Sequence, residues 1–193
     1  MDGLKAHGYQ VVLANPAGNE QYSGLKYTDD KYDARWLAQM VRLGIIKTGY
    51  IYPKQERPIR DLLRKRMKLV GQRTANLLSV QNTISRNTGL SMRWRKIEEL
   101  TNEEMGKLFG DELISQAPKA SLPLIGEMDK QIKQIEKTVT GRAKLRDEYE
   151  LLKTVWGVGT ILGLTIMYET GEISRFEQVG DRRMPVILSW DAR

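Results

Sequence analysis

Two aspartates, Asp30 and Asp33, have the residue type and spacing that point most directly to chemistry. They open the stretch TDDKYDARWLAQMVRLG (residues 28–44), whose apolar pattern predicts a helix that begins near Asp29 or Asp30 and ends at Gly44. Residues three apart share a helix face, so both carboxylates could bind one Mg²⁺ ion, although two-ion phosphoryl transfer needs further acidic groups. Acidic residues also favour a first helical turn because they cap it and complement the macrodipole. The spacing alone therefore leaves both interpretations open.

Positive charge is concentrated in the middle of the chain. A structural element in this region would therefore present that charge to a binding partner. The net charge is +7, and residues 57–100 contain eleven basic and three acidic residues, while the flanking parts are close to neutral. A local field of this kind attracts polyanions such as phosphate backbones, although a merely solvated helix face is the alternative. The candidate nucleic-acid-binding side chains in this region are Arg57, Arg60, Arg64, Lys65, Lys68 and Arg73.

Composition excludes several other classes of protein. Hydrophobic residues make up 40% and charged residues 28%, which is ordinary for a globular chain, and no apolar run approaches the length of about 18 residues needed to span a bilayer. The N-terminal MDGLKAHGYQ lacks the pattern of a signal peptide, and the chain has no cysteine. We therefore expect a cytoplasmic protein with no membrane role, no disulfide and no thiolate metal site.

The elements expected around the aspartates suggest part of an α/β sheet. GYQVVLANP (residues 8–16) is rich in β-branched residues and predicts a buried strand, and TGYIYP (residues 48–53) predicts a second extended segment after the helix. Strand, helix and strand in this order are typical of a βαβ unit. Because two strands are too few for a stable sheet, we expect residues 1–56 to be a piece of a larger domain.

A long helical arm is predicted over residues 57–150. One helix runs from Pro58 to about Ser85, with Asn87 and Gly89 near its end, and Thr101 and Glu104 form a capping-box pattern for a later helix. An apolar seam of this kind needs a partner, which is either the basic helix folding back or the same seam in a second subunit. The seam residues are Leu63, Val70, Leu77 and Ile84 in the first helix, and Ile125, Met128, Ile132, Ile135 and Val139 in a later one.

Residues 151–176 predict a helix, a Gly157-Val158-Gly159 turn and another helix. Gly157 and Gly159 would allow a phosphate to approach the backbone at the N-terminus of the second helix, as in a helix-hairpin-helix contact to nucleic acid. A tight turn between helices explains the same residues equally well, because Gly-x-Gly is short and frequent.

At the aspartates the chain resembles a known family. TDDKYDARWLA is similar to the D-x-x-DA-x-x-LA signature of the DEDD transposases of bacterial insertion sequences, the insertion-sequence one-ten family that includes the pilin-gene invertase. The resemblance continues in the same order through RPIRDLLRKRMKLVGQRTANLLSVQN and VWGVGTILGLTIMYETGEISRF, up to about Asp181.

The resemblance implies a RuvC-like catalytic domain of RNase H fold, a coiled-coil arm for subunit contacts, and a C-terminal transposase domain. Members of the family recombine DNA with Mg²⁺ and are directed by a structured guide RNA, so the expected partners are DNA, such an RNA and further copies of the chain. By this resemblance Asp30 and Asp33 are the third and fourth letters of the DEDD set, and hence catalytic metal ligands.

The chain also departs from the family pattern. The first Asp and the Glu of the set would precede Met1, and the nucleophilic serine would lie in sequence that VGDRRMPVILSWDAR does not match, so Ser189 is no substitute. His7 and Tyr32 have no arrangement around them that indicates catalysis. We therefore expect a transposase fragment that lacks activity alone, with a non-catalytic nucleic-acid-binding coiled-coil module or a decayed gene product as alternatives.

The expected fold is mixed and mainly α. It comprises a partial RNase H-like α/β piece over residues 1–56, a long antiparallel coiled-coil arm over residues 57–150, and the start of a helical transposase domain over residues 151–193. The last part has a divergent tail from about residue 182.

Overall fold

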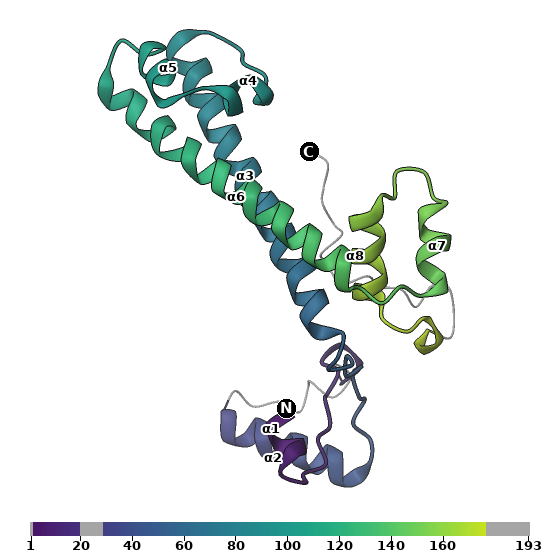
Figure 1. Ribbon diagram of the computed structural model, residues 1–193. Helices are drawn as coiled ribbons and strands as arrows, with labels where there is room; N and C mark the ends of the chain where they lie inside the picture. Colours follow the sequence, from purple (N-terminus) through teal and green to yellow (C-terminus); the bar gives the residue numbers. More distant parts are fainter. Residues whose placement is uncertain (1, 20–28, 177–193) are drawn as a thin grey trace. The chain divides into compact units, whose positions relative to one another are not determined.

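The computed structural model describes residues 2–19 and 29–176, and over these ranges the chain is mainly helical (Figure 1). It divides into two compact units, the first ending at Pro53 and the second beginning at Lys54. The expected tail beyond Asp181, with Ser189, lies outside the described residues. The helices are α1 (Asp2–Ala6), α2 (Asp30–Leu43), α3 (Arg57–Thr88), α4 (Trp94–Glu99), α5 (Asn102–Lys107), α6 (Glu112–Arg142), α7 (Asp147–Lys153), α8 (Thr160–Thr170) and the 3-10 helix η2 (Ile173–Arg175).

The expected α/β piece is not present in the first unit. Among its described residues, the segments 8–16 and 48–53 form no strand, and a single antiparallel bridge joins Ala14 to Thr48. A βαβ unit would require parallel pairing of these segments. Two short segments without neighbouring strands bury too little surface to form a sheet, so the β-branched run stays extended without becoming a strand.

One buried asparagine, Asn19, strengthens the connection at this bridge. Its Nδ2 donates hydrogen bonds to the carbonyl oxygens of Asn15, at 2.6 Å, and Lys47, at 2.9 Å. The backbone N–H of Lys47 donates to Asn19 Oδ1 at 2.9 Å. A side chain that is 7% exposed thus satisfies both polar groups of the Lys47 backbone. Asn19 thus reinforces two backbone hydrogen bonds, from the N–H of Asn15 to the Lys47 oxygen at 2.8 Å and from the N–H of Gly49 to the Leu13 oxygen at 2.6 Å.

Helix α2 begins and ends where the sequence predicts. The Asp29 side chain accepts a hydrogen bond from the N–H of Lys31 at 3.3 Å, so Asp29 is the N-cap. At the other end Gly44 has φ +68° and ends the helix in the left-handed conformation that glycine favours. Only Met40 is buried on this helix, so α2 is weakly packed among the described residues.

Helices α3 and α6 form the arm, in which they run side by side and antiparallel (Figure 1). Arg66 Nη2 lies 2.7 Å from Glu136 Oε1, and Arg73 Nε lies 2.6 Å from Asp129 Oδ1. A step of seven residues toward the C-terminus of α3 therefore corresponds to a step of seven residues toward the N-terminus of α6, as antiparallel helices require. Of the two partners that the seam allows, the structure contains the basic helix folded back within one chain.

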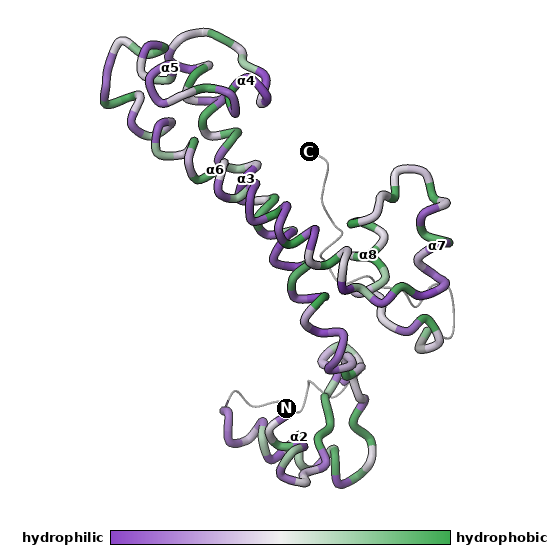
Figure 2. The backbone as a smooth tube through the Cα atoms, in the orientation of Figure 1, coloured by the Kyte–Doolittle hydropathy of each residue, from purple (hydrophilic) through white to green (hydrophobic). Residues whose placement is uncertain are grey.

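The predicted apolar seam of the arm is confirmed. Figure 2 shows hydrophobic and hydrophilic residues alternating along α3 and α6, as amphipathic helices require. Val70, Met128 and Ile135 are half-buried. The remaining seam residues are buried: Leu63, Leu77, Ile84, Ile125, Ile132 and Val139.

The end of the arm where α3 finishes has its own core, closed by α4 and α5. Gly89, with φ +70°, ends α3 as predicted. The predicted capping box begins α5: the N–H of Glu104 donates to Thr101 Oγ1 at 3.2 Å, and the N–H of Thr101 donates to Glu104 Oε2 at 2.8 Å. We call the buried cluster here the distal core, and it comprises Leu77, Val80, Ile84, Met92, Ile97, Met105, Phe109 and Ile125.

Helix α6 starts well before the seam and passes through two prolines. Pro118 and Pro123 lie inside the helix, where each removes a backbone donor. Pro118 is fully buried, so the packing of its ring offsets part of that loss. Asp111 caps the helix by accepting from the N–H of Leu113 at 2.8 Å.

The opposite end of the arm carries α7 and α8, joined by the predicted Gly157–Gly159 turn. The basal core here is formed by Leu63, Val139, Tyr149, Leu164, Met167 and Tyr168. Arg146 fixes this end by pairing with Glu56 and by donating from Nη1 to the Gly171 carbonyl oxygen at 3.0 Å. Among the residues that the structure describes, no helix has both the length and the apolar character needed to cross a membrane.

Candidate functional site

The acidic pair lies on the first turn of α2, as predicted. Asp30 is exposed and Asp33 is half-buried. The capping role of Asp29 and the position of both other carboxylates at the positive end of the helix dipole give this negative charge a structural role. The geometry thus supports the structural interpretation, in which these aspartates cap the helix and complement its dipole.

A magnesium centre is not completed by the residues around this turn. Within residues 2–19 and 29–176, no three His, Cys, Asp or Glu side chains lie close enough together to hold a metal ion. Mg²⁺ needs octahedral oxygen coordination, and a two-ion centre needs carboxylates from several elements. Asp30 and Asp33 alone therefore do not fit the two-ion site that the family resemblance implies.

Two of the predicted nucleic-acid-binding arginines hold the fold together. Arg64 makes a bidentate pair with Glu169 of α8, with Nε to Oε1 at 2.6 Å and Nη2 to Oε2 at 2.7 Å. Arg73 pairs with Glu98 of α4 as well as Asp129 of α6. Planar guanidinium groups suit such paired contacts, so much of the positive charge of these two residues is matched within the chain.

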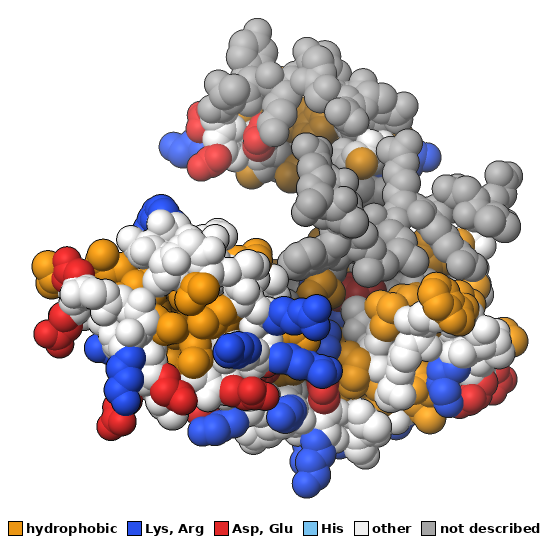
Figure 3. All heavy atoms as spheres, turned by 90° about the horizontal axis from the view of Figure 1, so that it is seen from above, with side chains coloured by type: hydrophobic (Ala, Val, Ile, Leu, Met, Phe, Trp, Pro, Cys, Tyr) orange, Lys and Arg blue, Asp and Glu red, His pale blue; other side chains and the backbone are white. Residues whose placement is uncertain are grey.

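The lysines of α3 remain available to a partner. Lys65 and Lys68 are exposed, and neither makes an ion pair with another part of the described chain. Arg57 and Arg60 are half-buried near the start of the helix. Figure 3 shows Lys and Arg side chains gathered on the face that is seen, with Asp and Glu side chains among them. The mixture explains why net charge overstates the number of available cations.

The Gly157–Gly159 turn lies next to a second pair of lysines, which sequence reasoning missed. Lys133 and Lys137 of α6 line a shallow hollow together with Thr160 and Ile161, the first residues of α8. Glu136 also lines this hollow, and its carboxylate is paired with Arg66 of α3. Gly157 has φ +86°, and Gly159 precedes α8 without any side-chain cap. The two exposed lysines therefore lie near the start of α8, whose first N–H groups have no side-chain cap. Only the i, i+4 spacing of the lysines could have indicated this pair from sequence.

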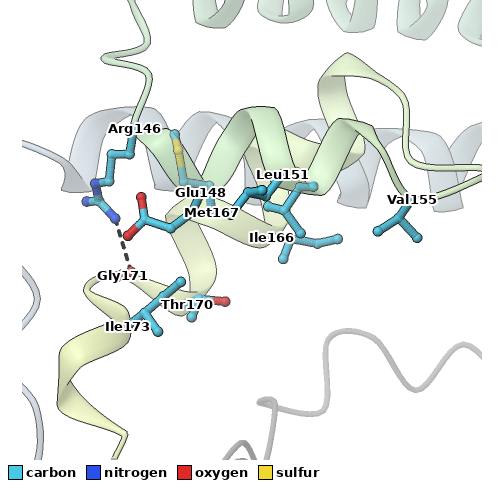
Figure 4. A pocket seen from close by; sticks show the side chains of 10 residues that line it. Arg146, Glu148, Leu151, Val155, Ile166, Met167, Thr170, Gly171 and Ile173 are labelled. Atoms are coloured by element: carbon cyan, nitrogen blue, oxygen red, sulfur yellow. Dashed lines mark hydrogen bonds between the residues drawn. The ribbon is translucent and has the colours of Figure 1, made fainter.

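An apolar cavity of about 280 Å³ lies between α7 and α8 (Figure 4). Leu151, Val155 and Ile166 line it, and Arg146 and Glu148 lie at one end. Its walls offer a surface for apolar groups and no pair of acid and base suited to catalysis.

Besides Tyr149, the basal core contains a second buried tyrosine, Tyr168. Its hydroxyl oxygen accepts a hydrogen bond from the N–H of Lys144 at 3.0 Å. Burial raises the pKa of Tyr168 above its ordinary value. The phenol is therefore neutral at physiological pH and acts as a structural hydrogen-bonding group.

Comparison with models of known protein families, with curated proteins and with solved structures finds no match. Membership of the DEDD transposase family therefore stays a prediction from TDDKYDARWLA and the segments that follow it. To the predicted and exposed Lys65 and Lys68 on α3, the geometry adds the exposed pair Lys133 and Lys137 beside the start of α8.

Proposed function

We propose that this chain is part of an insertion-sequence DNA transposase, and that its second unit binds the phosphate backbone of nucleic acid. The observation that carries the proposal is the hollow where Lys133 and Lys137 lie beside the uncapped start of α8. Ammonium groups near an uncapped helix N-terminus suit a phosphate. Lys65 and Lys68 on α3 supply a further contact to the same polyanion.

The chain is proposed to bind without catalysing recombination alone. Asp30 and Asp33 could provide two oxygen ligands to Mg²⁺, which would supply Lewis-acid chemistry at a phosphodiester in the complete family centre. The described residues do not complete that centre, so no reaction step is assigned to them. A non-catalytic nucleic-acid-binding module is the second candidate, and the arm's well-packed cores favour it over a decayed product.

Self-association of the chain is proposed to use the outside of the arm, because the seam is already occupied. Leu78 on α3 is 50% exposed and Leu124 on α6 is 53% exposed. The antiparallel register places these two exposed leucines at the same level along the arm. A second copy of the chain and a structured guide RNA are the partners that the family resemblance implies.

The binding proposal is tested by charge reversal with fluorescence anisotropy on a 20-base-pair DNA duplex and on an RNA hairpin. Lys65→Glu/Lys68→Glu and Lys133→Glu/Lys137→Glu should each weaken binding. Each lost phosphate contact should lower the slope of log affinity against log salt by about 1. Unchanged affinity and slope in both variants would refute the phosphate-binding proposal.

The matched control is Lys5→Glu/Lys107→Glu, which removes the same charge from exposed lysines outside both pairs and should leave the salt slope unchanged. The same proteins incubated with Mg²⁺ and DNA should show no strand cleavage or exchange. Turnover by the purified chain would overturn the proposal that it is inactive alone.

A further inference from the structure

We infer that Trp94 is a stacking platform for an unpaired base of a single-stranded nucleic acid. Trp94 is the first residue of α4 and is 50% exposed, although it belongs to a helix that packs on the distal core through the buried Ile97. This surface is separate from both lysine pairs of the proposed function. It takes a different ligand feature, the face of a base instead of the phosphate alone.

The segment around Trp94 is strongly and locally basic. Residues 86–96 contain four basic residues and no acidic residue. All four, Arg86, Arg93, Arg95 and Lys96, are exposed, and within the described ranges none of them forms an ion pair. Unlike Arg64 and Arg73, these cations have no carboxylate that neutralises them. They suit the phosphates on either side of a base that stacks on the ring.

The indole is held in place by an arginine that is itself fixed. The guanidinium carbon of Arg73 lies 5.9 Å from the centre of the Trp94 ring. Arg73 pairs with Glu98 on α4 and Asp129 on α6, so three helices fix its position. A cation over an aromatic ring is attracted by the ring quadrupole. Trp94 is therefore preorganised and loses little side-chain entropy when a ligand binds.

A second arginine, Arg95, can give up its contact with the indole ring and bind a phosphate instead. The guanidinium carbon of Arg95 lies 5.5 Å from the Trp94 ring centre, and this side chain is exposed. When a base stacks on the exposed part of the indole, Arg95 can turn to the adjoining phosphate without breaking an ion pair. Duplex bases have their faces covered by neighbouring pairs, so the platform selects unpaired strands.

The test measures binding of the full chain to a single-stranded DNA 12-mer of mixed sequence, to RNA of the same sequence and to the blunt DNA duplex. Trp94→Ala should weaken binding to both single strands by about 5- to 150-fold, the range expected for loss of one base–aromatic stack. Trp94→Phe should retain most of the affinity. The duplex should bind Trp94→Ala and the parent chain equally.

Leu90→Ala is the matched control, because Leu90 lies in the same basic segment and is 49% exposed but has no aromatic face. It should bind the single strand as the parent does. A change in salt slope should follow Arg93→Glu/Arg95→Glu and not Trp94→Ala, since stacking releases no counterions.

The outcomes separate this inference from the proposed function. Loss of duplex binding in the lysine variants, with Trp94→Ala unchanged on single strands, would overturn the platform and leave the phosphate-binding proposal standing. Binding of single strands that depends on Trp94, with no binding of the duplex, would support the platform and overturn the phosphate-binding proposal. Equal losses for Trp94→Ala and Leu90→Ala would also overturn the inference, because they would assign the effect to apolar area.

Discussion

The two units differ in what holds them together. In the first unit the described buried residues are Met40, Tyr52 and Asn19, and a polar contact joins its extended segments. The second unit has a distal core and a basal core at opposite ends of an antiparallel helix pair. A helix pair satisfies its backbone locally and needs only side-chain packing, whereas a sheet piece depends on neighbouring strands. The lesson is that the arm contains what it needs to be stable and the first unit contains much less.

Of the changes that test this comparison, Leu63→Ala is expected to lower the free energy of unfolding most. Leu63 is 1% exposed in the basal core, and a buried Leu→Ala change costs about 2–5 kcal/mol. Urea unfolding followed by circular dichroism should show this loss. Leu78→Ala on the same helix removes a half-exposed side chain and should cost less than about 1 kcal/mol. Equal losses for both variants would contradict the proposed basal core.

The next effect concerns the first unit alone. Asn19→Ala removes the partner of the part-buried Lys47 N–H, while the Lys47 oxygen keeps the N–H of Asn15; an unsatisfied buried polar group costs about 1–3 kcal/mol. Hydrogen exchange read by mass spectrometry should show faster exchange around residues 13–19 and 45–49, with exchange in α3 and α6 unchanged. Gln10→Ala, an exposed change in the same unit, should have no effect. Faster exchange throughout the arm would break the distinction between the units.

The smallest effect concerns the capping box beside the distal core. Thr101→Ala should lower the stability of the second unit by about 1 kcal/mol, the usual value of an N-cap. The backbone N–H and then the hydroxyl of Thr101 lower the pKa of Glu104, so its stabilising contribution is complete at neutral pH and is lost as the pH falls through that lowered pKa. The stability difference between the parent and Glu104→Gln should therefore shrink below about pH 4. A difference that stays constant with pH would contradict this assignment.

The arm could be predicted because its information is local. The seven-residue spacing from Leu63 to Ile84, the glycine at position 89 and the Thr101–Glu104 pattern each depend on nearby residues. The strand over residues 8–16 was wrong because its outcome depends on partners that a β-branched run cannot specify. The continuation of α6 through Pro118 was missed for a similar reason, since tertiary burial outweighed the local rule.

The candidate site could be predicted only in part. Composition identified Arg64 as a cation, but not its pairing with Glu169, 105 residues along the chain. The lysines at 133 and 137 gained a possible role only when the fold brought them beside α8. Asp30 and Asp33 were placed correctly on their helix turn, because capping is determined within a few residues.

The register of the arm has a consequence for its length. Arg66 and Arg73 face Glu136 and Asp129 at the same interval in opposite directions along the chain. Deleting one heptad from α3 and the facing heptad from α6 would leave the remaining contacts aligned and shorten the arm by about 10 Å. Deleting either heptad alone would misalign every contact on one side of the cut. Insertions and deletions compatible with this fold should therefore arise as matched pairs.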